Sequence, residues 1–383
     1  MSLPALPAEA HRILLLTRDD RAAARAAVAA LPLERQVALV CETPMARRGE
    51  LLDLAPSPEL LIPALPEAEL CFTVKAIGLA DAGWVLEHAT TEQIVACVDL
   101  DGWEDQTPDL SRVGEWLGAV AEAGEEALVP ATHAIDPELL VLWLMDRIEV
   151  FLKPPDSEDD GWQPPAGGLT LDGQFYFRAR KEDDDLGDIR SLLDALFRND
   201  YWRYFRMLQG TVWELRAESE EWALRWRAGR LLDLGFPPFE EAMAIYGVLP
   251  ARQLDELPPE GAFAPIGEWP LPVWMPRLPV TSAAEHSVFR ALAALPEQER
   301  RSHLYAFLAL ANRVAVAERM PLGDAETIPR ALERAAERVS AGLDHLVAAR
   351  AVDPTEVLRR ASLERLFRVG STLSGDAPFA APG

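Results

Sequence analysis

The feature that most constrains the fold is a helix-opening signal that recurs along the chain. Between Leu65 and Phe151 it occurs three times, as Leu65-Pro66-Glu67, Thr90-Thr91-Glu92-Gln93 and Asp136-Pro137-Glu138. Proline suits the first position of a helix, because the N–H that it lacks would have no partner there, and acids favour the positive end of the helix dipole. Thr90 and Gln93 also have the spacing of a capping box. The signal predicts a series of short helices.

The same opening returns outside this stretch, at Leu6-Pro7, Leu31-Pro32, Leu257-Pro258 and Leu295-Pro296. Recurrence at uneven spacing favours stacked helix pairs, in which each unit buries its apolar face only against its neighbours. We therefore predict an all-α fold of stacked short helix pairs, similar to a helical repeat.

Apolar residues at helical spacing support this prediction. Leu110, Val113 and Trp116 begin one such face, which Leu117 and Val120 continue. The stretch Leu139–Met145 is apolar throughout, as in a helix that is covered on both sides, and it is expected at the centre of the N-terminal domain.

One segment has the signal of a β-hairpin. Leu169–Leu171 and Gln174–Arg178 flank Asp172-Gly173, a pair that favours a type I′ turn. The acidic runs Asp156–Asp160 and Glu182–Asp185 bound this segment, and they are typical of solvated linkers.

Composition shifts along the 383 residues divide the chain into six segments. They are an N-terminal helical-repeat domain (1–152), an acidic linker with the hairpin (153–187), a central helical domain rich in aromatic residues and arginine (188–249), a Pro-rich connector (250–281), a C-terminal helical domain (282–370) and a disordered tail (371–383).

The charge balance restricts the partners. Sixty-two acids against 37 bases give a net charge of −25. This argues against nucleic acid, which proteins bind through lysine and arginine, and against an anionic membrane surface. From Pro296 to the end there are 12 acids and 12 bases, so the whole excess lies in the first 295 residues. A basic protein partner would meet that part.

The cysteines and the hydropathy pattern indicate the compartment. Cys41, Cys71 and Cys97 have no close-pair spacing, which favours a reducing environment over a disulfide framework or a zinc site. Ile13–Leu16 is too short for a signal peptide, and no stretch reaches the ~18 apolar residues that span a bilayer. We expect a cytoplasmic protein that does not enter a membrane.

The strongest candidate site is a cluster of arginine and aromatic residues between Tyr201 and Arg230. Arginine stacks on aromatic faces and clamps carboxylates or phosphates with its planar fork. The predicted ligand-binding residues are Arg203, Arg206, Trp222, Arg225, Trp226, Arg227 and Arg230, and Trp202 and Trp213 lie among them. The competing interpretation is that the rings are core and that the arginines pair with the adjacent acids Glu214, Glu218, Glu220, Glu221 and Asp233.

Other patterns give no catalytic, metal or cofactor site. Asp99–Asp105 is acidic but lacks the ligand spacing of a calcium loop, so a helix-ending turn is expected there. Convergence of Glu285, His286, His303 and Glu318 on a metal is a minor alternative, because none has the i, i+3 or i+4 pairing of known motifs. No phosphate-binding loop, dinucleotide fingerprint or nucleophile elbow occurs. We expect a protein that is not an enzyme.

Three stretches between Arg225 and Gly370 carry a family resemblance, and the likeness covers most of the chain from about Leu65 to Gly370. The chain resembles a bacterial family known only as a domain of unknown function, so the resemblance implies no functional residue. The stretches are Arg225-Trp226-Arg227-Ala228-Gly229-Arg230-Leu231-Leu232-Asp233-Leu234-Gly235-Phe236-Pro237-Pro238-Phe239-Glu240-Glu241-Ala242, Ala311-Asn312-Arg313 with Ala317-Glu318-Arg319, and Leu366-Phe367-Arg368-Val369-Gly370.

A weaker resemblance concerns residues 31–150, which share the flavour of a helical domain whose units open with Leu-Pro-x-Glu, as Leu31-Pro32-Leu33-Glu34 does here. In this they are similar to the helical cytoplasmic N-terminal domain of MgtE magnesium transporters, although the motif mostly reflects helix capping. The sequence therefore favours a non-catalytic helical scaffold or adaptor that binds a protein partner through an acidic surface. The alternative is a regulator that responds to a ligand or a divalent cation.

Overall fold

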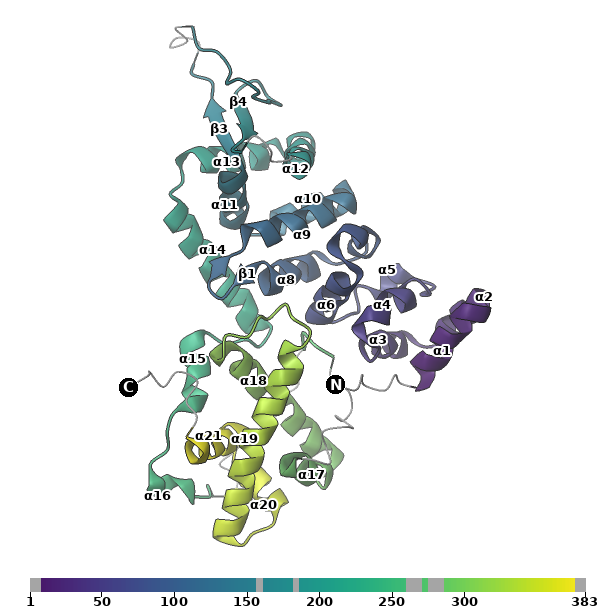
Figure 1. Cartoon of the computed structure of the whole chain (residues 1–383), viewed down its shortest axis with the longest axis vertical. Helices are drawn as coiled ribbons and strands as arrows, with labels where there is room; N and C mark the ends of the chain where they lie inside the picture. Colours follow the sequence, from purple (N-terminus) through teal and green to yellow (C-terminus); the bar gives the residue numbers. More distant parts are fainter. Residues whose placement is uncertain (1–7, 156–160, 182–185, 260–270, 275–285, 376–383) are drawn as a thin grey trace. The chain divides into compact units, whose positions relative to one another are not determined.

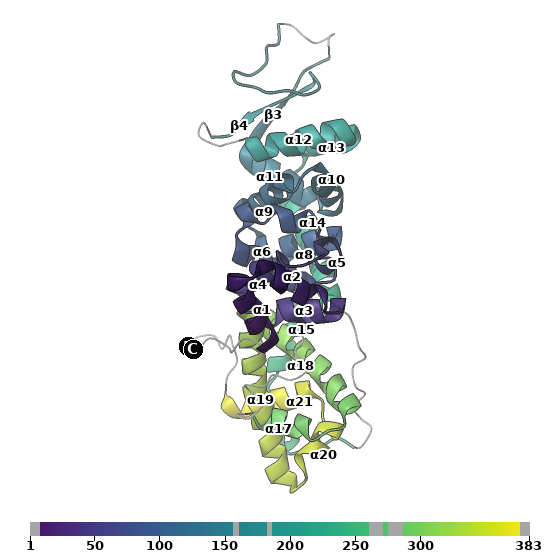
Figure 2. The same ribbon diagram turned by 90° about the vertical axis from the view of Figure 1, so that its right-hand side faces the viewer.

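The structure is a computed structural model and describes residues 8–155, 161–181, 186–259, 271–274 and 286–375. These residues form mostly α-helices, together with two small two-stranded antiparallel sheets (Figures 1 and 2). The predicted mostly α fold with a small β insertion is therefore confirmed.

The chain divides into two compact units, Met1–Arg230 (unit 1) and Leu231–Gly383 (unit 2). The predicted central domain, residues 188–249, contributes to both units. The reason is packing: α12 contacts α9 and α10, and α13 contacts α11, all in unit 1, whereas α15 contacts α18 of unit 2. The division falls inside the last turns of α14 (Arg216–Asp233).

Unit 1 is a succession of short helices, most of which pack on near neighbours in the chain. Thus α1 contacts α2, α4 contacts α6, α6 contacts α8, and α9 contacts α11. Figure 1 shows the succession from α1 in purple to α12 and α13 in teal. The helices are α1 (Ala8–Asp19), α2 (Arg21–Ala29), α3 (Leu33–Cys41), α4 (Met45–Leu52), α5 (Pro58–Leu61), α6 (Glu67–Ile77), the 3-10 helix η1 (Leu79–Asp81), α7 (Gly83–Leu86), α8 (Thr91–Asp101), α9 (Leu110–Glu122), α10 (Glu125–Ala134), α11 (Pro137–Arg147), α12 (Gly187–Asn199) and α13 (Tyr201–Trp213).

The predicted helix openings largely hold in detail. Thr90 and Gln93 form the capping box of α8, since each side chain bonds to the backbone of the other. Pro137 is the first residue of α11, as predicted. Pro66, by contrast, lies one position earlier, at the N-cap of α6. The apolar faces of α9 and α11 are buried.

The β-hairpin prediction is right about the strand and wrong about its main partner. β4 (Phe175–Ala179) pairs with β3 (Ile148–Leu152), which follows α11 directly, and Leu169 adds a single bridge to Phe177. Asp172 does not stand in a two-residue turn. Its carboxylate accepts hydrogen bonds from the backbone N–H groups of Gln174 and Phe175, and this holds the start of β4.

A second small sheet follows α8, where a turn was expected. β1 (Trp103–Glu104) pairs with β2 (Thr107–Pro108), and Asp105 between them has a positive φ of 55°. The acids before this sheet have protein partners. The carboxylate of Asp101 accepts from Lys75 Nζ at 2.5 Å and from Trp116 Nε1 at 3.0 Å, which joins α8 to α6 and α9.

Unit 2 is organised around the long helix α19, which contacts α17, α18, α20 and α21. The α19–α21 crossing is very close, because glycines stand at the contact. A Cβ added at Gly342 would lie 2.0 Å from the backbone oxygen of Leu366, and one added at Gly370 would lie 2.0 Å from that of Arg338. The helices are α15 (Phe239–Met243), the 3-10 helix η2 (Ala244–Tyr246), α16 (Ala251–Leu254), α17 (Ser287–Ala293), α18 (Glu297–Ala317), α19 (Thr327–Arg350), α20 (Pro354–Arg360) and α21 (Leu363–Ser374).

Helices extend into two of the segments predicted from composition. α21 continues to Ser374, past residue 371 where a tail was predicted, and Val369, Gly370 and Ser371 within it are buried. The Pro-rich connector contains the short helix α16. Some of the segments discussed above lie outside the described residues. They are the acidic runs 156–160 and 182–185 and part of the Pro-rich connector, including its apolar residues Phe263, Ile266 and Trp269.

Within the described part of the chain, no single helix is long and apolar enough to cross a membrane. Taken together, α10 and α11 reach the required length and composition, but they are bent by 109°.

Candidate functional site

The predicted site residues lie on two consecutive helices. Arg203 and Arg206 belong to α13, and the other five belong to α14. The structure does not bring all seven together. It separates them into an interior network, an exposed aromatic surface and a pocket.

Arg230 belongs to the interior network. Its guanidinium donates to both carboxylate oxygens of Asp99, at 2.6 and 2.9 Å, and to both of Asp136, at 2.8 and 2.7 Å. The side chains of Asp99 and Asp136 are only 2% and 7% exposed. Burial alone would lower the pKa of Arg230, but the hydrogen bonds to the two carboxylates raise it above its ordinary value. Through these bonds, Arg230 holds α14 against α8 and the start of α11.

Arg227 is also structural. Its Nε donates to the backbone oxygen of Asp99 at 2.8 Å, its Nη1 donates to that of Asp105 at 3.1 Å, and its guanidinium lies 4.8 Å from the ring centre of Trp103. Burial lowers the pKa of Arg227 to about 10, which leaves it charged at neutral pH. Arg227 and Arg230 therefore have partners, as the competing interpretation expected, but these are Asp99, Asp105 and Asp136, which are distant in the sequence, and not the adjacent acids.

The other α14 candidates form an exposed surface, the α14 tryptophan pair, defined by Trp222, Arg225 and Trp226. The two indole rings stack with centres 6.1 Å apart, and Arg225 lies 5.2 Å from the Trp222 ring. The tryptophans are 45% and 50% exposed. On α13, Trp202 and Trp213 are exposed as well. The competing interpretation that these rings are core is therefore wrong.

Two acids stand beside the tryptophan pair. Glu218 lies one turn before Trp222 and Glu221 precedes it directly; both are exposed, and neither forms an ion pair with any residue that the structure describes. Their neighbour Glu220 differs, because it accepts from Arg216 Nε at 2.9 Å. The surface thus combines apolar rings with unpaired negative charge.

A pocket of about 510 Å³, here called the α11–α13 pocket, contains the two remaining candidates. Arg203, Arg206, Met207 and Trp213 line it from α13, Glu138 from α11, and Glu214 from the end of α13. Arg203 Nη2 donates to the backbone oxygens of Thr132 and Ile135 at the end of α10. Burial, followed by the nearby charge of Arg206, lowers the pKa of Arg203.

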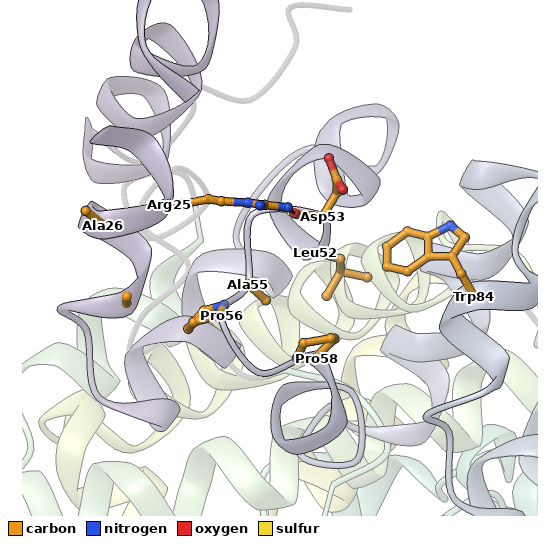
Figure 3. Close-up of a pocket in the computed structure, with 9 residues that line it drawn as sticks. Arg25, Ala26, Leu52, Asp53, Ala55, Pro56, Pro58 and Trp84 are labelled. Atoms are coloured by element: carbon orange, nitrogen blue, oxygen red, sulfur yellow. Dashed lines mark hydrogen bonds between the residues drawn. The ribbon is translucent and has the colours of Figure 1, made fainter. Parts of the chain in front are cut away.

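A second hollow, of about 490 Å³, lies between α2, the α4–α5 connection and α7, in the view of Figure 3. Arg25 extends across it toward Asp53 and donates to the backbone oxygen of that residue at 3.2 Å, while Trp84 stands at the other side. The carboxylate in this hollow is already paired, since Asp53 forms an ion pair with Arg21, and we therefore consider the α11–α13 pocket the better candidate for a charged ligand.

The histidines and cysteines do not assemble into a site. His303 is buried and contacts backbone oxygens of Glu299 and Leu358, His286 faces Glu333, and Glu318 accepts from Tyr246. Glu285 is outside the described residues. The minor alternative of a metal bound by these residues is therefore wrong for the described part, where no group of three or more potential ligands occurs. The three cysteines are free and buried, and burial raises the pKa of Cys41 and of Cys97.

The comparisons with known proteins place the chain in a family. It belongs to DUF6178, a family of unknown function whose model matches residues 25–381. This confirms the resemblance inferred from the signature around Arg225–Ala242 and extends it toward the N-terminus. No curated protein and no solved structure matches the chain significantly, so the resemblance to the MgtE domain has no support from them.

Proposed function

We propose that this member of the DUF6178 family is a non-catalytic helical adaptor that binds a basic protein partner. The observation that carries the proposal is the α14 tryptophan pair. Tryptophan and arginine are the residues that most often dominate the free energy of protein–protein binding. Two stacked, half-exposed indoles contribute less to folding than buried ones do, and a partner would cover their remaining apolar area.

Charge favours a basic partner. The net charge of −25 lies in the first 295 residues, which include the tryptophan pair, and Glu218 and Glu221 beside it have no ion pair with described residues. Lysine or arginine on a partner would pair with these acids while its apolar groups cover the rings. The net charge would also speed the encounter, and this contribution weakens as salt screens it.

The experiment is affinity capture of the tagged full-length chain from cells that express it, with a matched tryptophan control. We expect a stoichiometric protein partner with the unchanged chain and with Trp84→Ala, which removes an exposed tryptophan elsewhere in unit 1. The partner should be lost with Trp222→Ala/Trp226→Ala. Equal recovery by all three chains would contradict the proposal, and so would turnover of a metabolite by the purified protein. Capture from the cytoplasmic fraction would support the expected location.

A second candidate function is regulation by a small ligand. The observation that favours it is the α11–α13 pocket, which gathers charged groups of both signs around an apolar floor. This function does not compete with the first, because an adaptor can respond to a ligand.

A further inference from the structure

We propose that the α11–α13 pocket binds a free α-amino acid, with the carboxylate of the ligand facing Arg203 and Arg206 and its ammonium group facing Glu138 and Glu214. The inference deepens the second candidate function and does not depend on partner binding through α14.

The lining of the pocket contains two cations, Arg203 and Arg206, and two anions, Glu138 and Glu214. Arg203 is tethered to carbonyl oxygens of α10 at 2.7 and 3.2 Å, and Glu214 accepts from Ser219 Oγ at 3.1 Å. None of Arg203, Arg206, Glu138 and Glu214 forms an ion pair with any residue that the structure describes. Opposite charges around a surface hollow usually pair with each other. Here they are positioned to be joined by a ligand that carries both charges.

Part of this charged lining is buried without a partner. One carboxylate oxygen of Glu138 and the Nε of Arg203 are both inaccessible to solvent and lack a hydrogen bond. A buried polar group without a partner costs about 1–3 kcal/mol, and more where it is charged. Both atoms are too deep for a ligand to bond with them directly, but an ammonium group near Glu138 and a carboxylate near Arg203 would offset the uncompensated charge of these two side chains.

The floor of the pocket suits an apolar side chain. Met207, Val141 and Trp213 contribute apolar atoms to its lining. Gly210 also lines the pocket, and a larger residue there would crowd two other lining residues, since a Cβ would lie 2.9 Å from a methyl group of Val141 and 2.9 Å from Glu214 Oε1. The volume of about 510 Å³ is within the roughly 300–1,000 Å³ of small-molecule sites.

Ligands with a single charge fit less well. An isolated anion such as phosphate would meet Glu138 and Glu214, and an isolated cation would meet Arg203 and Arg206. Like charges in contact cost several kcal/mol. A dipolar ligand orients each end toward the opposite charge and avoids both penalties.

The test is calorimetric titration of the full-length protein with each common free amino acid, and with N-acetyl and carboxamide forms of any that bind. We expect at least one amino acid with an apolar side chain to bind with a dissociation constant of about 1 mM or lower, and each blocked form to bind at least tenfold more weakly. Arg206→Gln and Glu214→Gln should each weaken binding at least tenfold, whereas Arg25→Gln in the other hollow should not change it.

Several results would overturn the inference. One is that no free amino acid binds at about 10 mM. Others are that an N-acetyl or carboxamide form binds as tightly as the free amino acid, that phosphate binds more tightly than any amino acid, or that Arg206→Gln binds the amino acid as the unchanged chain does. Melting curves of the variants without ligand show whether they are folded. Failure here leaves the adaptor proposal intact, because the α14 variants test that proposal separately.

Discussion

Arg230 and Asp99 stand 131 positions apart in the sequence, yet their side chains share two hydrogen bonds, from Nε at 2.6 Å and from Nη2 at 2.9 Å. The same guanidinium also binds both oxygens of Asp136. One arginine thus connects α14 to the end of α8 and the start of α11. This contact fixes the helix that presents the tryptophan pair.

Removing this arginine should destabilise unit 1. Arg230→Met removes the guanidinium that two buried carboxylates share, and breaking a buried pair in this way costs about 3–5 kcal/mol. Urea unfolding followed by tryptophan fluorescence measures the loss in unit 1, because only Trp269 and Trp274 lie in unit 2. Arg225→Met, on the exposed side of α14, should change stability by no more than about 0.5 kcal/mol. Equal effects of the two substitutions would refute the structural role of Arg230.

The tryptophans of α14 should matter little for folding. Trp222→Ala and Trp226→Ala remove half-exposed rings, so each should lower the free energy of unfolding by less than about 1 kcal/mol. Trp116→Ala deletes a fully buried ring that donates to Asp101, and it should cost about 3–5 kcal/mol. The comparison uses urea midpoints of the three variants. A large loss at Trp222 or Trp226 would show that the pair belongs to the core.

The α19–α21 crossing should require both glycines. In Gly342→Ala or Gly370→Ala the new methyl group meets a backbone oxygen that cannot turn away, so the helices must separate, at a cost of about 1–3 kcal/mol or more. Gly229→Ala on α14 is the matched control, because nothing lies within 4 Å of its added Cβ, and it should gain about 0.5–1 kcal/mol. Melting followed by helical circular dichroism distinguishes them. If Gly342→Ala left the melting temperature unchanged, the two helices would have to cross at a greater distance than the structure shows.

Stability at acid pH should depend on Asp353, the N-cap of α20. Its carboxylate accepts from the Thr355 hydroxyl at 2.6 Å and from the Thr355 backbone N–H at 2.8 Å, and these bonds lower the pKa of Asp353 below its ordinary value of 3.8. The unfolded chain therefore binds more protons in this range. The contribution is present above pH 3.8 and is lost as the pH falls through the folded-state pKa.

Asp353→Asn keeps the cap but does not titrate. The stability advantage of the unchanged chain over this variant should shrink as the pH falls from about 5 to about 2.5, as measured by urea midpoints across that range. An advantage that is constant with pH would mean that Asp353 titrates normally.

Local signals made the helices predictable. The Thr90–Gln93 capping box, the opening at Asp136-Pro137 and the apolar faces of α9 and α11 depend on residues within a few positions of each other, so the sequence alone identifies them. The signature around Arg225–Ala242 likewise identified the family. Gly370, a landmark of that resemblance, now has a physical reason in the close approach of α21 to α19.

Pairings between distant segments were not predictable in this way. β4 pairs along its length with Ile148–Leu152 and not with the nearer Leu169–Leu171, and β3 follows directly on α11, so its position depends on where the tertiary fold places that helix. In the same way, the sequence does not distinguish Arg227 and Arg230 from Arg225 on the same helix. Arg227 and Arg230 become structural only because α14 packs against α8, which places Asp99 beside them. One sequence signal was overlooked. Asp99 and Asp136 border apolar helices and have no lysine or arginine close to them in the sequence, so each needs a cationic partner from a distant segment.

The most direct test of the central claim is the affinity of the purified, captured partner for the full-length chain, measured by calorimetry at low and high salt. We predict that Trp222→Ala/Trp226→Ala weakens binding at least thirtyfold, corresponding to about 2 kcal/mol, that Trp84→Ala binds as the unchanged chain does, and that added salt weakens binding further. Equal affinity of the unchanged chain and the double variant would contradict the claim that α14 presents the binding surface.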